Sequence, residues 1–188
     1  LELTLPTCHI DLNLGARWQA ALEHCGILND DIEIEGEMVI SSNTGKPAVD
    51  ANFAVLRANI ERLDPYWPEG VMPENTLAWL RRGLLEGSID HGRFQIHGDM
   101  DNWPFRDGNG RFEAFAQISG VGIDYFEGWP MALDAEATAR FIGAGMDIEG
   151  VVNDLSGITA RDVRVTIDDM KAPLLDIGYS ANSDLSTF

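Results

Sequence analysis

Four histidines are the side chains in this sequence best suited to metal binding: His9, His24, His91 and His97. No two of them have the spacing of a common zinc motif. His91 and His97 would share one face of a strand, but they are six residues apart, too far along an extended chain to hold one ion. We therefore predict neither a metal site nor a bound cofactor.

A group of oxygen ligands resembles a calcium loop: Asp99, Asp101, Asp107 and Asn109. Trp103 stands where a ligand is needed, and the central glycine of an EF-hand loop is absent. The sequence Asp107-Gly108-Asn109-Gly110 is typical of a turn between two strands. We interpret these residues as a turn.

Acid–base or nucleophilic catalysis has no clear signature. With 31 Asp and Glu residues, some pair of carboxylates is always close enough to resemble a glycosidase site. The sequence contains no Gly-x-Ser-x-Gly elbow, no phosphate-binding glycine loop and no dinucleotide fingerprint. We predict that the segment is not an enzyme.

The two cysteines, Cys8 and Cys25, flank a turn expected around residues 15–17. A hairpin centred there would place them opposite each other, where a disulfide is geometrically possible. Two reduced, buried cysteines are the alternative, because a shift of the turn by one residue moves the pair apart.

The charge of the chain limits its partners. It has a formal net charge of −18 and a pI near 4.3, so its field repels phosphates, and we predict no nucleic-acid partner. No apolar stretch approaches the roughly 20 residues that cross a membrane. Residues 1–5 alternate as if inside a strand, and the first residue is not Met, so we interpret the chain as a piece of a longer protein.

Apolar residues that alternate with polar ones dominate the sequence, which is typical of strands with one dry face. Short turns such as residues 42–45 and 143–145 separate them, which favours an antiparallel sheet. We predict a mainly β fold, an antiparallel meander. The last strand would include Leu175, Ile177 and Tyr179.

One segment has helical spacing instead. Leu77, Leu80 and Leu84 predict an amphipathic helix over residues 73–85, with Pro73 in its first turn and Gly87 just after its end. The expected organisation is a single segment, 1–188, with strands over 1–63, a loop and helix over 64–86, and strands over 87–188.

An ordered series of short motifs carries a family resemblance. It runs through Tyr66-Trp67-Pro68, Trp79-Leu80, residues 87–98, residues 103–113 and Gly128-Trp129-Pro130. The series resembles the AsmA-like proteins of the YhdP type from the Gram-negative envelope, most closely over residues 60–150. The sequence has Tyr-Trp-Pro and Trp-Pro-Phe where Tyr-Leu-Pro and Phe-Pro-Phe are expected, and both changes keep an apolar corner.

The resemblance implies that the meander forms a curved sheet or groove (β-taco-like), and that the protein is a bridge-like lipid-transfer protein of the periplasm. Its full-length chain would be anchored in the inner membrane, and further β-rich repeats of the same chain would flank this segment. Phospholipid acyl chains would be its partners, carried between the inner and outer membranes in a hydrophobic β-groove that supports the outer-membrane barrier. Such a carrier needs no catalytic residue or cofactor.

The apolar strand faces would line that groove. The residues concerned are Ile32, Ile34, Met38, Ile40, Phe94, Ile96, Phe112, Ala114, Ala116, Ile118, Leu133, Ala135, Ala137, Ala139, Phe141, Val163, Val165 and Ile167. The small side chains from Ala135 to Ala139 would leave room for a ligand. The alternative is a β-sandwich that serves as a structural or protein-interaction module of the cell envelope, with the same faces closed on each other as a dry core.

Overall fold

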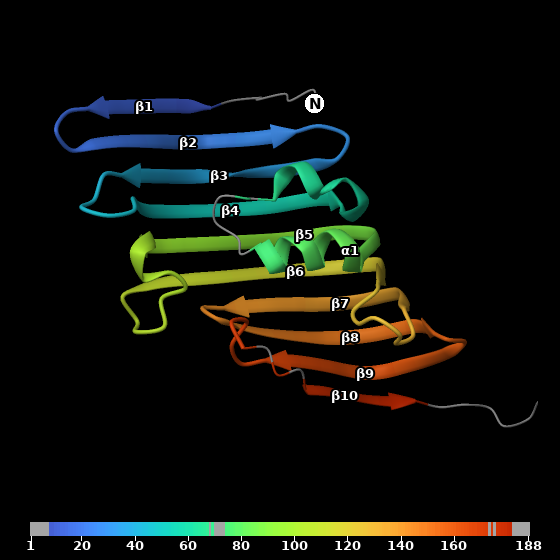
Figure 1. Ribbon diagram of the computed structural model, residues 1–188. Helices are drawn as coiled ribbons and strands as arrows, with labels where there is room; N and C mark the ends of the chain where they lie inside the picture. Colours follow the sequence, from blue (N-terminus) through green and yellow to red (C-terminus); the bar gives the residue numbers. More distant parts are fainter. Residues whose placement is uncertain (1–7, 68, 70–73, 173, 175, 182–188) are drawn as a thin grey trace, which may run out of the picture.

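The computed structural model describes residues 8–67, 69, 74–172, 174 and 176–181. Its strands form one antiparallel sheet in which each strand pairs with the next, in the order β1 to β10 (Figure 1). The strands are β1 (His9–Leu14), β2 (Trp18–Leu28), β3 (Ile32–Ser41), β4 (Ala48–Asn59), β5 (Leu84–Asp99), β6 (Gly110–Ile123), β7 (Ala132–Ile142), β8 (Gly145–Leu155), β9 (Ile158–Ile167) and β10 (Asp176–Ala181).

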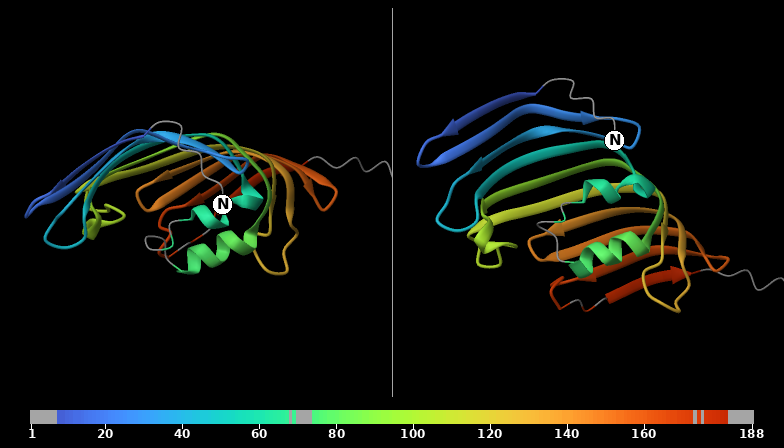
Figure 2. Two further views of the ribbon diagram at one scale, coloured as in Figure 1. Left: turned by 90° about the horizontal axis from the view of Figure 1, so that it is seen from above. Right: turned by 45° about the horizontal axis from the view of Figure 1, so that its top comes forward.

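The prediction of a mainly β, curved antiparallel meander is confirmed. The sheet is arched and does not close on itself (Figure 2). The sandwich alternative is wrong for the described strands, because they form a single sheet and no second sheet faces it. The turn over residues 42–45 joins β3 to β4 as expected, and Asp107, Gly108 and Asn109 form a turn before β6. The alternation at residues 1–5 and the expected strand residue Leu175 lie outside the described residues.

Irregular pairing explains why the sheet is bent. The register shifts in six of the nine strand pairings. Several non-glycine residues at these shifts have left-handed backbones, among them His24 (φ 53°), Asp134 (φ 51°) and Asp162 (φ 52°). An extra residue in one strand of a pair bends that strand and increases its twist. The strands therefore curve around the helix instead of running flat (Figure 2).

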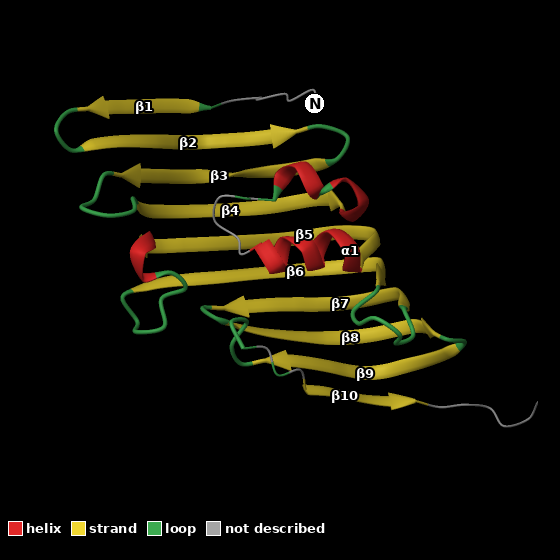
Figure 3. Cartoon of the chain, in the orientation of Figure 1, coloured by secondary structure: helices red, strands yellow, loops and turns green. Residues whose placement is uncertain are grey.

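The helical elements lie on the concave side of the arch (Figures 2 and 3). They are the 3₁₀ turns η1 (Ile60–Arg62) and η2 (Asp64–Tyr66), the helix α1 (Glu74–Gly83) and the 3₁₀ turn η3 (Met100–Asn102). We call η1, η2 and α1 together the cover. None of the described helices is long and apolar enough to cross a membrane.

The predicted helix is confirmed, but its C-terminal end was placed too late. The helix ends at Gly83, and Leu84 already pairs with Ile123 as the first residue of β5. Asp124 donates its backbone N–H to the Gly83 carbonyl at 2.9 Å, so hydrogen bonding to the neighbouring strand begins at this point. Gly87 does not follow the helix; it lies inside β5 with φ 113°, a conformation that glycine adopts most easily. Pro73 lies outside the described residues.

A cluster of buried apolar residues lies between the sheet and the cover. Ile60 and Leu63 join Ile32, Ala58, Val121 and Ala135 in one apolar cluster, and Leu77 of α1 is also buried, at 6% exposure. The Tyr66 hydroxyl accepts a hydrogen bond from the Asn29 amide at 2.7 Å, which ties η2 to the β2–β3 turn. The cover is therefore a packed part of the fold.

Candidate functional site

The apolar residues of neighbouring strands meet in rows that run across the sheet. We call three of these, read from the cross-strand register, the concave rows. The first contains Met38, Ala51, Ile96 and Phe112; the second contains Phe53, Phe94, Ala114, Phe141, Met146 and Ile167; the third contains Ile34, Val55, Gly92, Ala116, Ala139, Ile148 and Val165. The rows are continuous because antiparallel neighbours point their side chains to the same face.

The face that carries these rows is the concave one. Ile34, Val55 and Ile118 pack against the same cluster that Ile60 of η1 and Leu63, just after η1, join, and η1 lies under the arch (Figure 2). None of the residues in the concave rows is charged. Charged residues alternate with them and therefore lie on the convex face. The sheet thus has one apolar and one ionic face.

Most of the predicted lining residues are brought together by the register. Those outside the three rows extend them: Ile40 pairs with Ala20 and Val49, Ile118 with Ala137, Ala135 with Val121, and Val163 with Gly150. Ile32 is buried against the cover. These positions establish a shared face; their contact with lipid stays a prediction.

Leu133 is the exception. The alternation breaks at Asp134, and the buried residue beyond the break is Ala132, which is 6% exposed and pairs with Ile123 and Leu155. Leu133 is half-buried and pairs with Asp154. Ala132, not Leu133, therefore continues the dry face, because an extra residue in a strand reverses its alternation.

Strand β4 supplies concave residues beyond the predicted lining residues. Its alternating residues Val49, Ala51, Phe53 and Val55 belong to the rows. Phe53 and Phe94 stack with their ring centroids 5.1 Å apart. The signal was present in the sequence, because the apolar residues alternate with Asp50 and Asn52.

Small side chains occupy the middle of the third concave row. Gly92, Ala116 and Ala139 are direct neighbours in the third row. A Cβ atom at Gly92 would lie 3.3 Å from the Val55 Cβ and 3.1 Å from the Phe115 carbonyl oxygen, so this position is close to its size limit. The buried cluster under the cover contains no residue of the second row. Three residues of this row, Phe53, Phe94 and Phe141, remain partly exposed.

The concave face is flanked by the cover on one side and by the loop of residues 103–109 on the other (Figure 2). In this loop Trp103 packs on Phe112 with ring centroids 4.8 Å apart, and Phe105 is buried. Arg106 donates two hydrogen bonds to the Asp169 carboxylate, at 2.6 and 3.2 Å. The loop is thus held to the β9–β10 connection.

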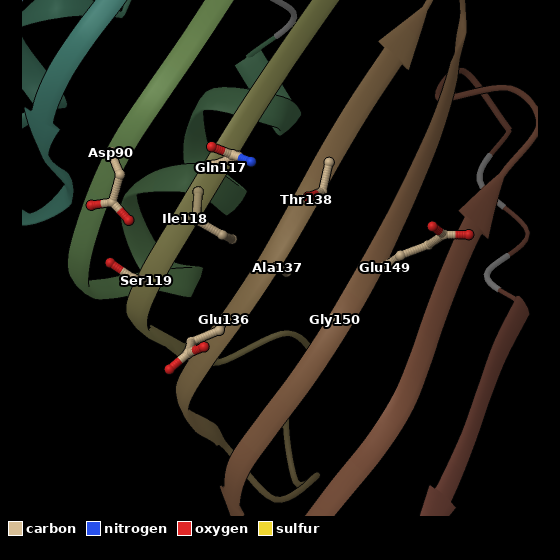
Figure 4. A pocket seen from close by; sticks show the side chains of 9 residues that line it. All are labelled: Asp90, Gln117, Ile118, Ser119, Glu136, Ala137, Thr138, Glu149 and Gly150. Atoms are coloured by element: carbon tan, nitrogen blue, oxygen red, sulfur yellow. The ribbon is translucent and has the colours of Figure 1, made fainter.

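The convex face has a shallow, open depression of about 380 Å³. Its polar side chains come from β5 to β8 and point away from α1 (Figure 4). Ser88 donates a hydrogen bond to Asp90 at 2.7 Å, and the hydroxyls of Ser88 and Ser119 lower the pKa of this carboxyl. A catalytic acid needs a raised pKa, so Asp90 is poorly suited to that role. Within the described residues, no group of three or more His, Cys, Asp or Glu side chains could hold a metal ion.

The structure joins Cys8 and Cys25 in a disulfide. Leu14 pairs with Trp18 and His9 with Glu23, so continuing this register would place Cys8 opposite His24. His24 has a left-handed backbone (φ 53°) at a register shift between Leu22 and Cys25. The bulge therefore brings Cys25, one residue further on, to Cys8.

These features define the class of protein: it is a β-protein with a single open, curved sheet whose concave rows are apolar and uncharged. The chain belongs to the YhdP family, since the family model described as "YhdP protein" matches residues 2–188. Among curated proteins it is similar to the "Intermembrane phospholipid transporter YhdP" of Escherichia coli (strain K12), with 24% identity over 131 residues. That match covers 66% of this chain and 10% of the relative. No solved structure matches the chain.

Proposed function

We propose that this chain is a segment of a periplasmic lipid-transfer protein whose concave face carries phospholipid between the inner and outer membranes and so supports the outer-membrane barrier. One observation carries the proposal: the concave rows cross the sheet from β3 to β9 without a charged residue. The printed name of the E. coli relative, an intermembrane phospholipid transporter, supports the same activity.

The physics of lipid transfer requires such a surface. Burial of one methylene is worth about 0.8 kcal/mol, so a two-chain lipid that crosses water unprotected faces a barrier on the order of 20 kcal/mol. An apolar face that shields the acyl chains lowers this barrier without any chemical step. The charged convex face keeps the carrier in solution.

The two edges of the sheet support the expected continuation of the groove. Within the described residues, β1 pairs with β2 alone and β10 with β9 alone. Apolar side chains of β1 remain exposed at this edge, with Ile10 at 56% and Leu12 at 59%. We propose that flanking repeats of the same chain extend the sheet, and that the full-length protein is anchored in the inner membrane.

The experiment that tests the proposal is native mass spectrometry of the purified chain after incubation with phospholipid vesicles. Ala116→Trp adds a large side chain in the third concave row, next to Gly92 and Ala139. Ala54→Trp is the matched control, because Ala54 lies between Glu35 and Arg93 on the convex face. We expect bound phospholipid in the wild type and in the control, and its loss in Ala116→Trp.

Circular dichroism and thermal unfolding show whether both variants remain folded. A wild-type chain that takes up no lipid contradicts the proposal. So does a folded Ala116→Trp variant that binds as much lipid as the control.

A further inference from the structure

Two arginines beside the concave face are already neutralised. On the cover, Arg81 of α1 forms ion pairs with Asp64 of η2 and with Glu69. Two carboxylates thus bind one guanidinium, and the cover together with Glu69 has four acidic and three basic residues, a formal net charge of −1. An anionic group that arrived here would compete with both carboxylates for Arg81.

The opposite flank has the same arrangement. Arg106 makes its two hydrogen bonds to Asp169, and the Lys171 backbone N–H donates a third bond to this carboxylate at 2.8 Å. The neighbouring residues Asp107 and Asp168 add two negative charges, and Lys171 adds one positive charge. Neither flank therefore offers these arginines to a phosphate without breaking an ion pair.

The rest of the chain adds to this field. It has 31 acidic and 13 basic residues, a net charge of −18, and the concave rows contain no cation that would compensate. We infer, on the basis of the proposed function above, that the groove selects phospholipids with zwitterionic headgroups over those with a net negative headgroup.

The expected selectivity follows from the size of protein surface potentials. A potential of a few kT changes the affinity for one unit charge by roughly tenfold. Screening reduces it, because the Debye length falls from about 30 Å at low salt to about 3 Å at 1 M. Selection by acyl-chain fit would not depend on salt in this way.

The experiment uses vesicles of equimolar phosphatidylcholine and phosphatidylglycerol with identical acyl chains. The chain is incubated with them and re-isolated, and its bound lipid is measured by mass spectrometry. We expect roughly tenfold more phosphatidylcholine than phosphatidylglycerol at low ionic strength, and a ratio near one at about 1 M salt. Equal capture at low salt overturns the inference but leaves the proposed function intact. Capture of neither lipid contradicts the proposed function itself.

A double variant tests whether the flank is responsible. Asp64→Asn with Glu69→Gln frees Arg81, and we expect it to raise the captured share of phosphatidylglycerol several-fold. The control, Glu35→Gln with Glu37→Gln, makes the same charge change on exposed convex residues of β3. An equal effect of both variants would overturn the role of the flank. Asp169→Asn provides an independent test on the opposite flank if the first variant loosens the cover.

Discussion

Gly120 and Asp134 lie on neighbouring strands and correct each other's register. Ile118 and Val121 of β6 pair with Ala137 and Ala135 of β7. Two residues of β6 but only one residue of β7 lie between these pairs, so β6 has the extra residue here. The next pairs are Val121 with Ala135 and Ile123 with Ala132. Between them, one residue of β6 lies opposite two residues of β7, so β7 has the extra residue there. Both have left-handed backbones, with φ 61° at Gly120 and φ 51° at Asp134. This pair of bulges bends the sheet beside its most buried residue, Val121.

We predict that Gly120→Ala destabilises the chain by about 1–2 kcal/mol, because a Cβ atom is unfavourable in the left-handed region. No atom lies within 4 Å of the added Cβ, so the cost reports backbone conformation and not crowding. Gly178→Ala is the control: its Cβ also has open space, and its φ lies outside the left-handed region. Urea unfolding measures both; equal stability of the two variants would disprove the role assigned to the bulge.

Strand alternation predicted the fold class and most of the concave face, because period-two patterning reports which residues share a face. It failed where bulges interrupt the period: Leu133 was assigned to the dry face that Ala132 occupies. The helix end failed for a related reason, since Leu84 fits the helical spacing but pairs with Ile123 in the sheet.

Strand alternation alone could not separate an open sheet from a closed core. A closed core and an open groove have the same alternation, so residues such as Phe94 and Ala116 fit both. Only the strand order, with a single sheet and no facing one among the described strands, separates them. The ion pair of Arg106 and Asp169 could not be predicted from the sequence either, because it joins residues 63 positions apart.

The disulfide should stabilise the β1 edge. Cys8 and Cys25 are 17 residues apart, and closing a loop of this size contributes about 3 kcal/mol in the chain-entropy description. We predict that Cys8→Ser with Cys25→Ser speeds hydrogen exchange at the β1 amides while the amides of β5 and β6 keep their protection. Unchanged exchange in β1 would show that the disulfide does not hold this edge.

The cover should depend on Leu77. Its side chain is 6% exposed, and truncation of a buried leucine costs about 2–5 kcal/mol. We predict that Leu77→Ala lowers the free energy of unfolding by such an amount. Leu85→Ala, at a position 40% exposed, should change it by less than about 1 kcal/mol. Chemical denaturation compares the two, and similar losses would mean that α1 is not anchored through Leu77.

The pKa of the Asp169 carboxyl, which is paired with Arg106, should lie below the usual value for aspartate. Hydrogen bonds from Arg106, and then from the Lys171 N–H, lower the pKa of the Asp169 carboxyl. A lowered folded-state pKa means that the pair stabilises the fold above the unfolded pKa, about 3.9, and that this contribution is lost as the pH falls through the folded-state pKa. Carboxyl NMR should show the pKa of Asp169 rising in Arg106→Gln; an unchanged pKa would contradict the assignment.

The most direct test of the account is site-specific photocrosslinking to phospholipid. A benzophenone amino acid is placed at Ala116 or Ala139, which are paired in the third concave row, and for comparison at Ala54 or Gln117 on the convex face. After irradiation with phospholipid vesicles, we expect lipid adducts at the two concave positions and none at the convex ones. Adducts on both faces alike, or on the convex face alone, would contradict the claim that the concave face carries the acyl chains.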